Sequence, residues 1–219
     1  MQMKKSILSL FSLIFVGGLA YAGSMQIYGQ YLASKLQQNP LNLKVAPLQQ
    51  VRGTSCGEAV ITMVYNYAYP QTPIREQDVI EYATAEGYFT ETVSPYTSPA
   101  DMVYIAEYYA EAVSTGTVIN SGQGLSVLIQ KLRNGEPVII DVLSNLSDPE
   151  SEAHFIVVTG ISVDPNRDDA MVIHYNDPLT GGYESAEWAG TEGVWNAWKN
   201  NGDPGGSGWW LVISPPQSR

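Results

Sequence analysis

The amino-acid sequence predicts an α+β fold in which several helices precede a group of strands. Apolar residues recur at the helical period between residues 56 and 135, whereas the remainder of the chain carries short apolar runs typical of strands. Helices and strands do not alternate along the chain, as they would in a parallel βαβ sheet. The 219 residues suffice for one domain with its own core, and no boundary between domains is visible after residue 46.

Four segments carry the helical pattern. They are a segment that begins at Cys56 and residues 73–87, 98–112 and 124–135. Thr72 is the predicted N-cap of the second helix, and Gly87 is its stop signal. Ser98, followed by a proline, marks the start of the third helix in the same way, and a glycine closes the fourth.

Short apolar runs indicate five strands: residues 137–143, 154–163, 170–177, 183–188 and 209–213. The turn at 164–169 begins like a calcium loop, but Asp169 stands where such a loop requires glycine, so we predict a solvated hairpin turn. The glycine-rich stretch 202–208 is interpreted as a flexible loop before the last strand. Three tryptophans are candidates for lining a groove: Trp188, Trp195 and Trp198.

The first 22 residues are predicted to be a secretory signal peptide. Two lysines precede a short apolar run at residues 7–20, and small residues frame a cleavage site after Ala22. We therefore expect residues 1–22 to be removed and residues 23–44 to form an N-terminal lead-in segment. The expected location is secreted or periplasmic. An uncleaved N-terminal anchor is the alternative, although the apolar run is short for a spanning helix.

The charge and the composition limit the kinds of binding partner that we expect for this protein. The formal net charge is −11, and nucleic acid is not expected as a partner because phosphate contacts need clustered lysine and arginine. No later apolar run is long enough to span a membrane, so no stable membrane domain is expected after cleavage of the signal peptide. One cysteine and two histidines form no recognisable zinc set, so we predict neither metal nor cofactor. The oligomeric state is left open.

Cys56, the only cysteine of the chain, is a candidate nucleophile. Ser55 and Glu58 match the S-x-x-E capping box, which places Cys56 first in the helix. Unpaired N–H groups and the helix dipole at that position favour the thiolate, which is the nucleophilic form. Gly57 is expected to leave open space beside the sulfur. If Cys56 is not catalytic, the alternatives for an unpaired cysteine in an exported protein are an intermolecular disulfide and an inert buried thiol.

A thiolate nucleophile requires a base and a group that orients the base. His154 opens a predicted strand, where a side chain can face a cleft, whereas His174 lies inside the next strand. We therefore favour His154 as the base. Asp177 ends the strand that returns alongside His154 and is the favoured orienting group, with Asn176 as its rival. Strand alternation places Asp177 and His174 on opposite faces.

Acyl transfer also requires donors for the oxyanion of the tetrahedral intermediate. The backbone N–H of Cys56 is one candidate. Gln50 lies six residues upstream, and its side-chain amide is the candidate for the second donor. Gln49 is the rival for this role.

Three stretches together resemble the C39 and C39-like cysteine peptidases, which have a papain-like fold: QVRGTSCGEA (50–59), AHFIVVTGI (153–161) and YNDPLTGG (175–182). The resemblance implies a C39-like peptidase domain over residues 45–219, with helices packed on an antiparallel sheet. It assigns Cys56 as nucleophile, His154 as base, Asp177 as orienting group and Gln50 to the oxyanion hole.

This chain also departs from the best-known members of the family. Ser55 stands where those bacteriocin-leader peptidases often have aspartate, and no transport or ATP-binding domain accompanies the peptidase. Their Gly-Gly leader substrates are therefore not carried over to this chain, which is more similar to stand-alone exported members.

The expected function is that of a cysteine peptidase. It would hydrolyse peptide bonds of a peptide or protein substrate through a thioester acyl-enzyme. Two alternatives remain open. One is an acyltransferase of transglutaminase-like or phytochelatin-synthase-like type that uses the same triad. The other is a non-catalytic papain-like domain that only binds peptides.

Overall fold

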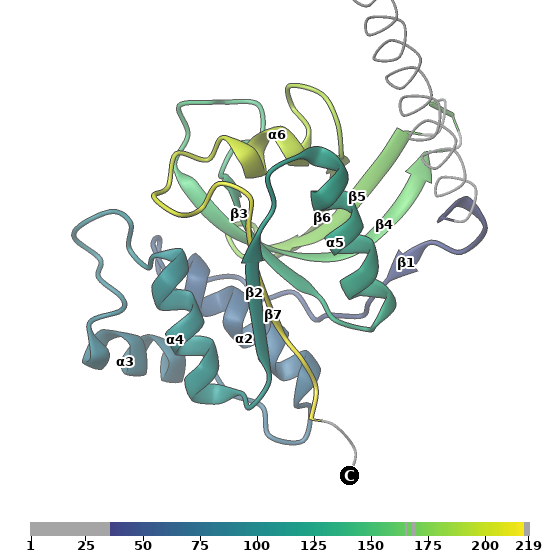
Figure 1. Cartoon of the computed structure of the whole chain (residues 1–219). Helices are drawn as coiled ribbons and strands as arrows, with labels where there is room; N and C mark the ends of the chain where they lie inside the picture. The colour runs from purple at the N-terminus through teal and green to yellow at the C-terminus, as the bar shows by residue number, and fades with distance from the viewer. Residues whose placement is uncertain (1–35, 165, 168–169, 217–219) are drawn as a thin grey trace, which may run out of the picture.

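The computed structural model describes residues 36–164, 166–167 and 170–216, and these form a mixed α+β domain, as predicted (Figure 1). The predicted signal peptide and residues 23–35 of the predicted lead-in lie outside the described residues. None of the helices in the described part of the chain is long and apolar enough to cross a membrane.

A seven-stranded antiparallel sheet forms the centre of the domain. Its strands are β1 (Leu41–Asn42), β2 (Val113–Thr117), β3 (Val138–Leu143), β4 (Ala153–Asp164), β5 (Ala170–Asp177), β6 (Gly182–Glu187) and β7 (Trp209–Ile213). The order is β2-β7-β3-β4-β5-β6, and β1 pairs with β4 beyond the end of β3. Because β1 lies before residue 45, the sheet includes two residues of the predicted lead-in segment.

Helices cover both faces of this sheet (Figure 1). One face carries α2 (Cys56–Ala68), α3 (Glu76–Glu86) and α4 (Pro99–Tyr109), and the other carries α5 (Ser121–Arg133) and α6 (Val194–Lys199). Strand residues alternate between the two cores. On β4, for example, Phe155 and Val157 pack with α2 and α4, whereas Ile156 and Val158 pack with α5 and α6. The strand ends therefore meet the start of α2 at one edge of the domain.

The start of the second helix was predicted wrongly. Arg75, not Thr72, is the N-cap of α3, because the side chain of Asn66 bonds both backbone groups of Ile74 at 2.8 and 3.0 Å. This contact holds the chain outside the helix until residue 75. Gly87 ends α3 in the left-handed region, with φ of 78°, as predicted. The fourth helix also begins earlier than predicted, at Ser121.

Three elements of the described part of the chain were not predicted: β1, β2 and α6. β2 reads VSTGT and has no apolar alternation, so its place in the sheet depends on pairing with β7. The groove predicted around Trp188, Trp195 and Trp198 is wrong. These rings pack against one another, with centroids 5.7 to 6.3 Å apart, and they surround Gly124 of α5 in the core.

Candidate active site

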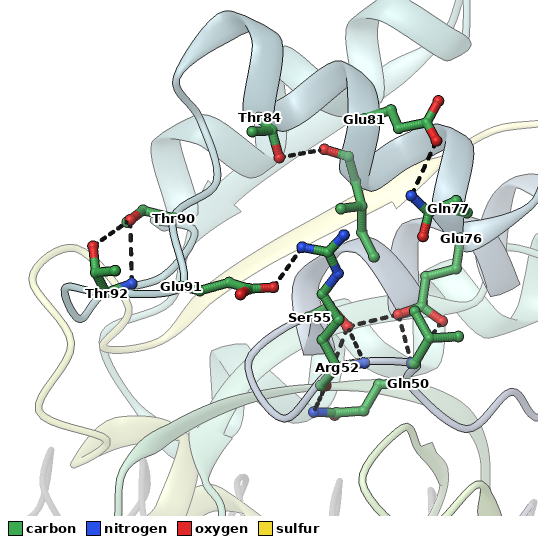
Figure 2. A network of polar contacts seen from close by, with 12 residues as sticks. Gln50, Arg52, Ser55, Glu76, Gln77, Glu81, Thr84, Thr90, Glu91 and Thr92 are labelled. Atoms are coloured by element: carbon green, nitrogen blue, oxygen red, sulfur yellow. Dashed lines mark hydrogen bonds and ion pairs between the residues drawn. The ribbon is translucent and has the colours of Figure 1, made fainter.

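Cys56 is the first residue of α2 and Ser55 is its N-cap, as predicted. The predicted capping box does not form. The Ser55 hydroxyl donates to the Oε1 atom of Glu76 at 2.7 Å (Figure 2). Glu58 turns inward, where it accepts from the Thr97 hydroxyl at 2.7 Å. Neither side chain therefore caps the first turn of the helix, and the N–H of Cys56 donates to no acceptor among the described residues.

The loop before α2 is fixed at both ends. Glu76 is buried and accepts the N–H of Val51 at 3.0 Å as well as the Ser55 hydroxyl (Figure 2). The backbone N–H of Gln50 donates to the carbonyl of Pro178 at 2.8 Å, directly after β5. The Gln50 side chain donates one N–H to the carbonyl of Arg52 at 2.7 Å. Gln50 thus lies between the start of α2 and the end of β5, and its second side-chain N–H is available.

His154 and Asp177 come together at the same edge. His154 is the second residue of β4 and Asp177 is the last of β5. The Nε2 atom of His154 lies 2.7 Å from the Oδ1 atom of Asp177, and the two side chains are only 6% and 13% exposed. The N–H of Leu179 also donates to this oxygen, at 2.8 Å, and so fixes the carboxylate. Nδ1 is left as the ring nitrogen that can serve Cys56.

The charges of the site favour an imidazolium. Burial lowers the pKa of His154, but hydrogen bonds and opposite charges from Asp177 and Cys56 outweigh burial and raise that pKa to about 10. Burial raises the pKa of Asp177, but the contact with His154 and backbone N–H groups bring it below its ordinary value. At neutral pH the ring of His154 is therefore a cation held between a carboxylate and the sulfur.

The rival residues lie elsewhere. His174 faces Ser162, with 2.8 Å between Nε2 and Oγ, and burial lowers its pKa. Asn176 is buried on the α2 side of the sheet, where its amide donates to the carbonyl of Val45 at 3.0 Å. Neither reaches His154, as the strand alternation indicated. Gln49 packs its Cβ atom against Gly181 in the turn after β5.

A small pocket of about 30 Å³ lies beside Cys56. Its lining includes Gly57, Thr97, Phe155 and Asp203. The space expected beside Gly57 is partly filled, because a Cβ atom on Gly57 would lie 2.8 Å from the sulfur of Met102. Gly57 therefore serves the close packing of α2 on α4. A larger hollow of about 610 Å³ lies between α2 and the loop before it, and neither Cys56 nor His154 lines it.

The model of one protein family, described as the Peptidase_C39 like family, matches residues 42–203. The chain belongs to this family. The matched range contains the start of α2 with Gln50 and Cys56, and also His154 and Asp177. Membership in the C39-like family supports a cysteine-peptidase type of domain, in agreement with the resemblance seen in the sequence. No curated protein matches the chain.

Two carboxyl groups near this C39-like site were not indicated by sequence patterns. Asp141 lies within β3, among valine, isoleucine and leucine, and is fully buried. Asp203 lies in the glycine-rich loop before β7 and lines the pocket beside Cys56. The sequence contained one signal for Asp141 that was not used, a carboxylate inside an otherwise apolar strand. Asp203 gave no signal, because its position depends on contacts distant in sequence.

Glu58 gives a prediction about stability. Its carboxyl is fully buried, and burial raises its pKa from 4.5 to about 7. The folded protein thus binds a proton that the unfolded chain releases between these pH values, so stability falls as pH rises from 4.5 to about 7. Glu58→Gln is expected to match the wild type at the acid end and to exceed it by about 3 kcal/mol above pH 7.

Chemical denaturation of both proteins across this pH range measures the difference. Glu107→Gln, which changes an exposed carboxylate on α4, is the matched control and is expected to show no such trend. A constant difference between Glu58→Gln and the wild type would show that Glu58 stays ionised in the folded protein.

Proposed function

We propose that this protein is a hydrolase that cleaves peptide bonds with Cys56, His154 and Asp177 as a catalytic triad. One observation carries the proposal. The Nε2 atom of the His154 imidazole lies 2.7 Å from the carboxylate of Asp177, and Cys56, at the start of a helix, is near enough to raise the pKa of His154. A cationic imidazole beside the sulfur would keep the sulfur in its nucleophilic form and would supply an acid for the leaving group. Membership in the C39-like family supports the same reading.

In the proposed reaction the thiolate of Cys56 attacks the carbonyl carbon of the scissile bond. The negative charge moves to the carbonyl oxygen, which would accept hydrogen bonds from the Cys56 N–H and the second side-chain N–H of Gln50. His154 gives its proton to the leaving amine, the C–N bond breaks and a thioester remains. His154 then takes a proton from water, whose oxygen attacks the thioester, and the acid product leaves as the thiolate and imidazolium are restored.

A digest of a peptide library tests this function. The folded protein is incubated with the library, and new peptide ends are identified by mass spectrometry. Hydrolysis predicts products with new carboxylic acids, each pair heavier than its parent by one water. If new ends appear only as amides when a simple amine is added, the protein is an acyltransferase. If the library stays intact under both conditions, the proposal of a peptidase fails.

The role of Gln50 gives a separate prediction. A side-chain donor in an oxyanion hole acts on the transition state, where the carbonyl oxygen carries the charge. Gln50→Ala is therefore expected to lower kcat by on the order of a hundredfold, while the rate at which iodoacetamide alkylates Cys56 changes little, because alkylation builds no oxyanion. Gln49→Ala is the matched control and is expected to change neither rate much.

Turnover and alkylation are measured on the same preparations. Normal turnover of Gln50→Ala would make Gln50 an ordinary loop residue. A parallel loss of both rates would show that Gln50 supports the start of α2 instead, through its contacts with Arg52 and Pro178.

A further inference from the structure

Two buried carboxyl groups, Asp141 and Asp203, form what we call the carboxyl pair of the pocket beside Cys56. Asp141 is fully buried and Asp203 is 9% exposed. By strand alternation Asp141 lies on the face of β3 that packs toward α2, and its link to the pocket is its neighbour Asp203. Asp203 lines the pocket together with Cys56. The carboxyl pair is therefore next to the proposed nucleophile, and the proposed reaction does not use it.

The loop between α6 and β7 holds the carboxyl pair together. The side-chain amide of Asn201 donates to the backbone carbonyl of Asp141 at 2.7 Å and accepts the N–H of Asp203 at 3.0 Å. The carboxyl of Asp141 also abuts Gly206 so closely that a Cβ atom there would lie 2.1 Å from Oδ2. The loop thus encloses Asp141 and turns Asp203 toward the pocket.

The carboxyl pair has no donor group of its own. Both side-chain oxygens of Asp141 and the Oδ1 atom of Asp203 are buried without a hydrogen-bond partner in the described part of the chain. None of the ion pairs found there involves either residue. Burial and the charge of Asp203 raise the pKa of Asp141 well above its ordinary value, and the charge of His154 acts in the opposite direction without cancelling them. The two neighbouring carboxyls therefore disfavour each other's ionised form.

We propose that the carboxyl pair is a subsite for a primary ammonium group of the substrate, bound directly beside the scissile bond. The ammonium supplies N–H donors to buried carboxyl oxygens that have no hydrogen-bond partner among the described residues, and its positive charge offsets the repulsion between the two carboxyls. The pocket of about 30 Å³ holds about one water molecule, which is the size of an ammonium group and smaller than a guanidinium or trimethylammonium group. This inference rests on the proposed function, since it specifies the substrate of the same site.

Charged thiol reagents test the subsite without a known substrate. Cys56 is the only cysteine, so a methanethiosulfonate reagent reports on it alone. The thiolate attacks the sulfenyl sulfur, a disulfide forms, the S–SO₂ bond breaks and methanesulfinate leaves. Three reagents are compared, which carry a 2-aminoethyl group, a 2-(trimethylammonio)ethyl group and a neutral methyl group. Each rate is divided by that of the same reagent with free cysteine.

The folded wild type is expected to prefer the primary ammonium reagent over the trimethylammonium reagent by about tenfold or more, as hydrogen bonds to a charged group allow. Both reagents carry one positive charge, so long-range attraction by the acidic protein does not distinguish them. In Asp203→Asn and Asp203→Ser, the normalised rates of the two cationic reagents are expected to become nearly equal to each other and to that of the methyl reagent. The normalised rate of the methyl reagent itself is expected to stay nearly unchanged. Glu150→Gln removes an exposed carboxylate outside the pocket and is the matched control, with the preference retained.

No preference in the wild type would overturn the subsite. A preference that persists in both Asp203 variants would also overturn it, because steric exclusion of the larger reagent would then be the cause. Peptide pairs distinguish the two sources of an ammonium group. Hydrolysis of a peptide with a free N-terminus, compared with the same peptide acetylated there, tests the α-ammonium group. Hydrolysis of a peptide that contains 2,3-diaminopropionate, compared with its uncharged analogue, tests a side-chain ammonium group. If the wild type hydrolyses no peptide but still prefers the primary ammonium reagent, the proposed peptidase function is rejected and the subsite is retained.

Discussion

Replacing Cys56 by alanine is expected to abolish peptide hydrolysis, with a loss of about 10⁴-fold or more. The thiolate forms the thioester in the proposed reaction, and the described residues contain no second cysteine that could replace it. The change is small and lies at the first position of α2, so the fold is expected to survive. Initial rates on peptides selected from the library digest measure the loss.

Circular dichroism and thermal unfolding of the Cys56→Ala variant provide the control. A folded variant that retains hydrolysis near the wild-type rate would end the assignment of a cysteine peptidase. Binding of peptides by this variant is a separate readout, since the pocket beside residue 56 remains.

The two histidines are expected to differ strongly. His154→Ala removes the proton carrier of both steps, and we expect a loss of kcat/KM of about a thousandfold or more. His174→Ala removes a contact with Ser162 and stacking on Tyr183, on another part of the sheet, so its expected loss is less than about threefold, with a stability cost of about 1 kcal/mol. Comparable losses for both variants would contradict the site described above.

Asp177→Asn extends this comparison. An amide can still hold the imidazole in place, so the loss is expected to be milder than that of His154→Ala. Asp177 raises the pKa of His154, and its removal lowers the pH at which the imidazolium loses its proton. The alkaline limb of the pH profile of kcat/KM is therefore expected to move to lower pH. An unchanged alkaline limb would assign that limb to another group.

Local patterns predicted the positions of the main elements and of the triad candidates. Cys56 begins α2 where the helical period of apolar residues starts, and Ser55 occupies the N-cap position without a side-chain capping bond. His154 and Asp177 end up together because each lies at the end of a strand on the same side of one hairpin. Such signals need only a few adjacent residues, which explains why the sequence was sufficient.

Contacts between distant residues account for the failures. Glu58 matched a capping box, but the hydroxyl of Thr97, 39 residues away, draws it inward, and Glu76 takes the hydroxyl of Ser55. β2 carries no apolar alternation, and only its pairing with β7 defines it. Asp203 was assigned to a flexible loop because its burial against Asp141 depends on the fold as a whole.

The alkylation rate of Cys56 tests the central claim, that His154 and Asp177 hold this cysteine in its reactive form. Iodoacetamide is added in brief doses at about pH 6, where a free cysteine is almost wholly protonated, and intact mass reports the modified fraction. The folded wild type is expected to react at least about tenfold faster than the chain unfolded in guanidinium chloride, and His154→Ala is expected to lose this advantage. A folded wild type that reacts no faster than the unfolded chain, or an advantage that survives in His154→Ala, would contradict the claim.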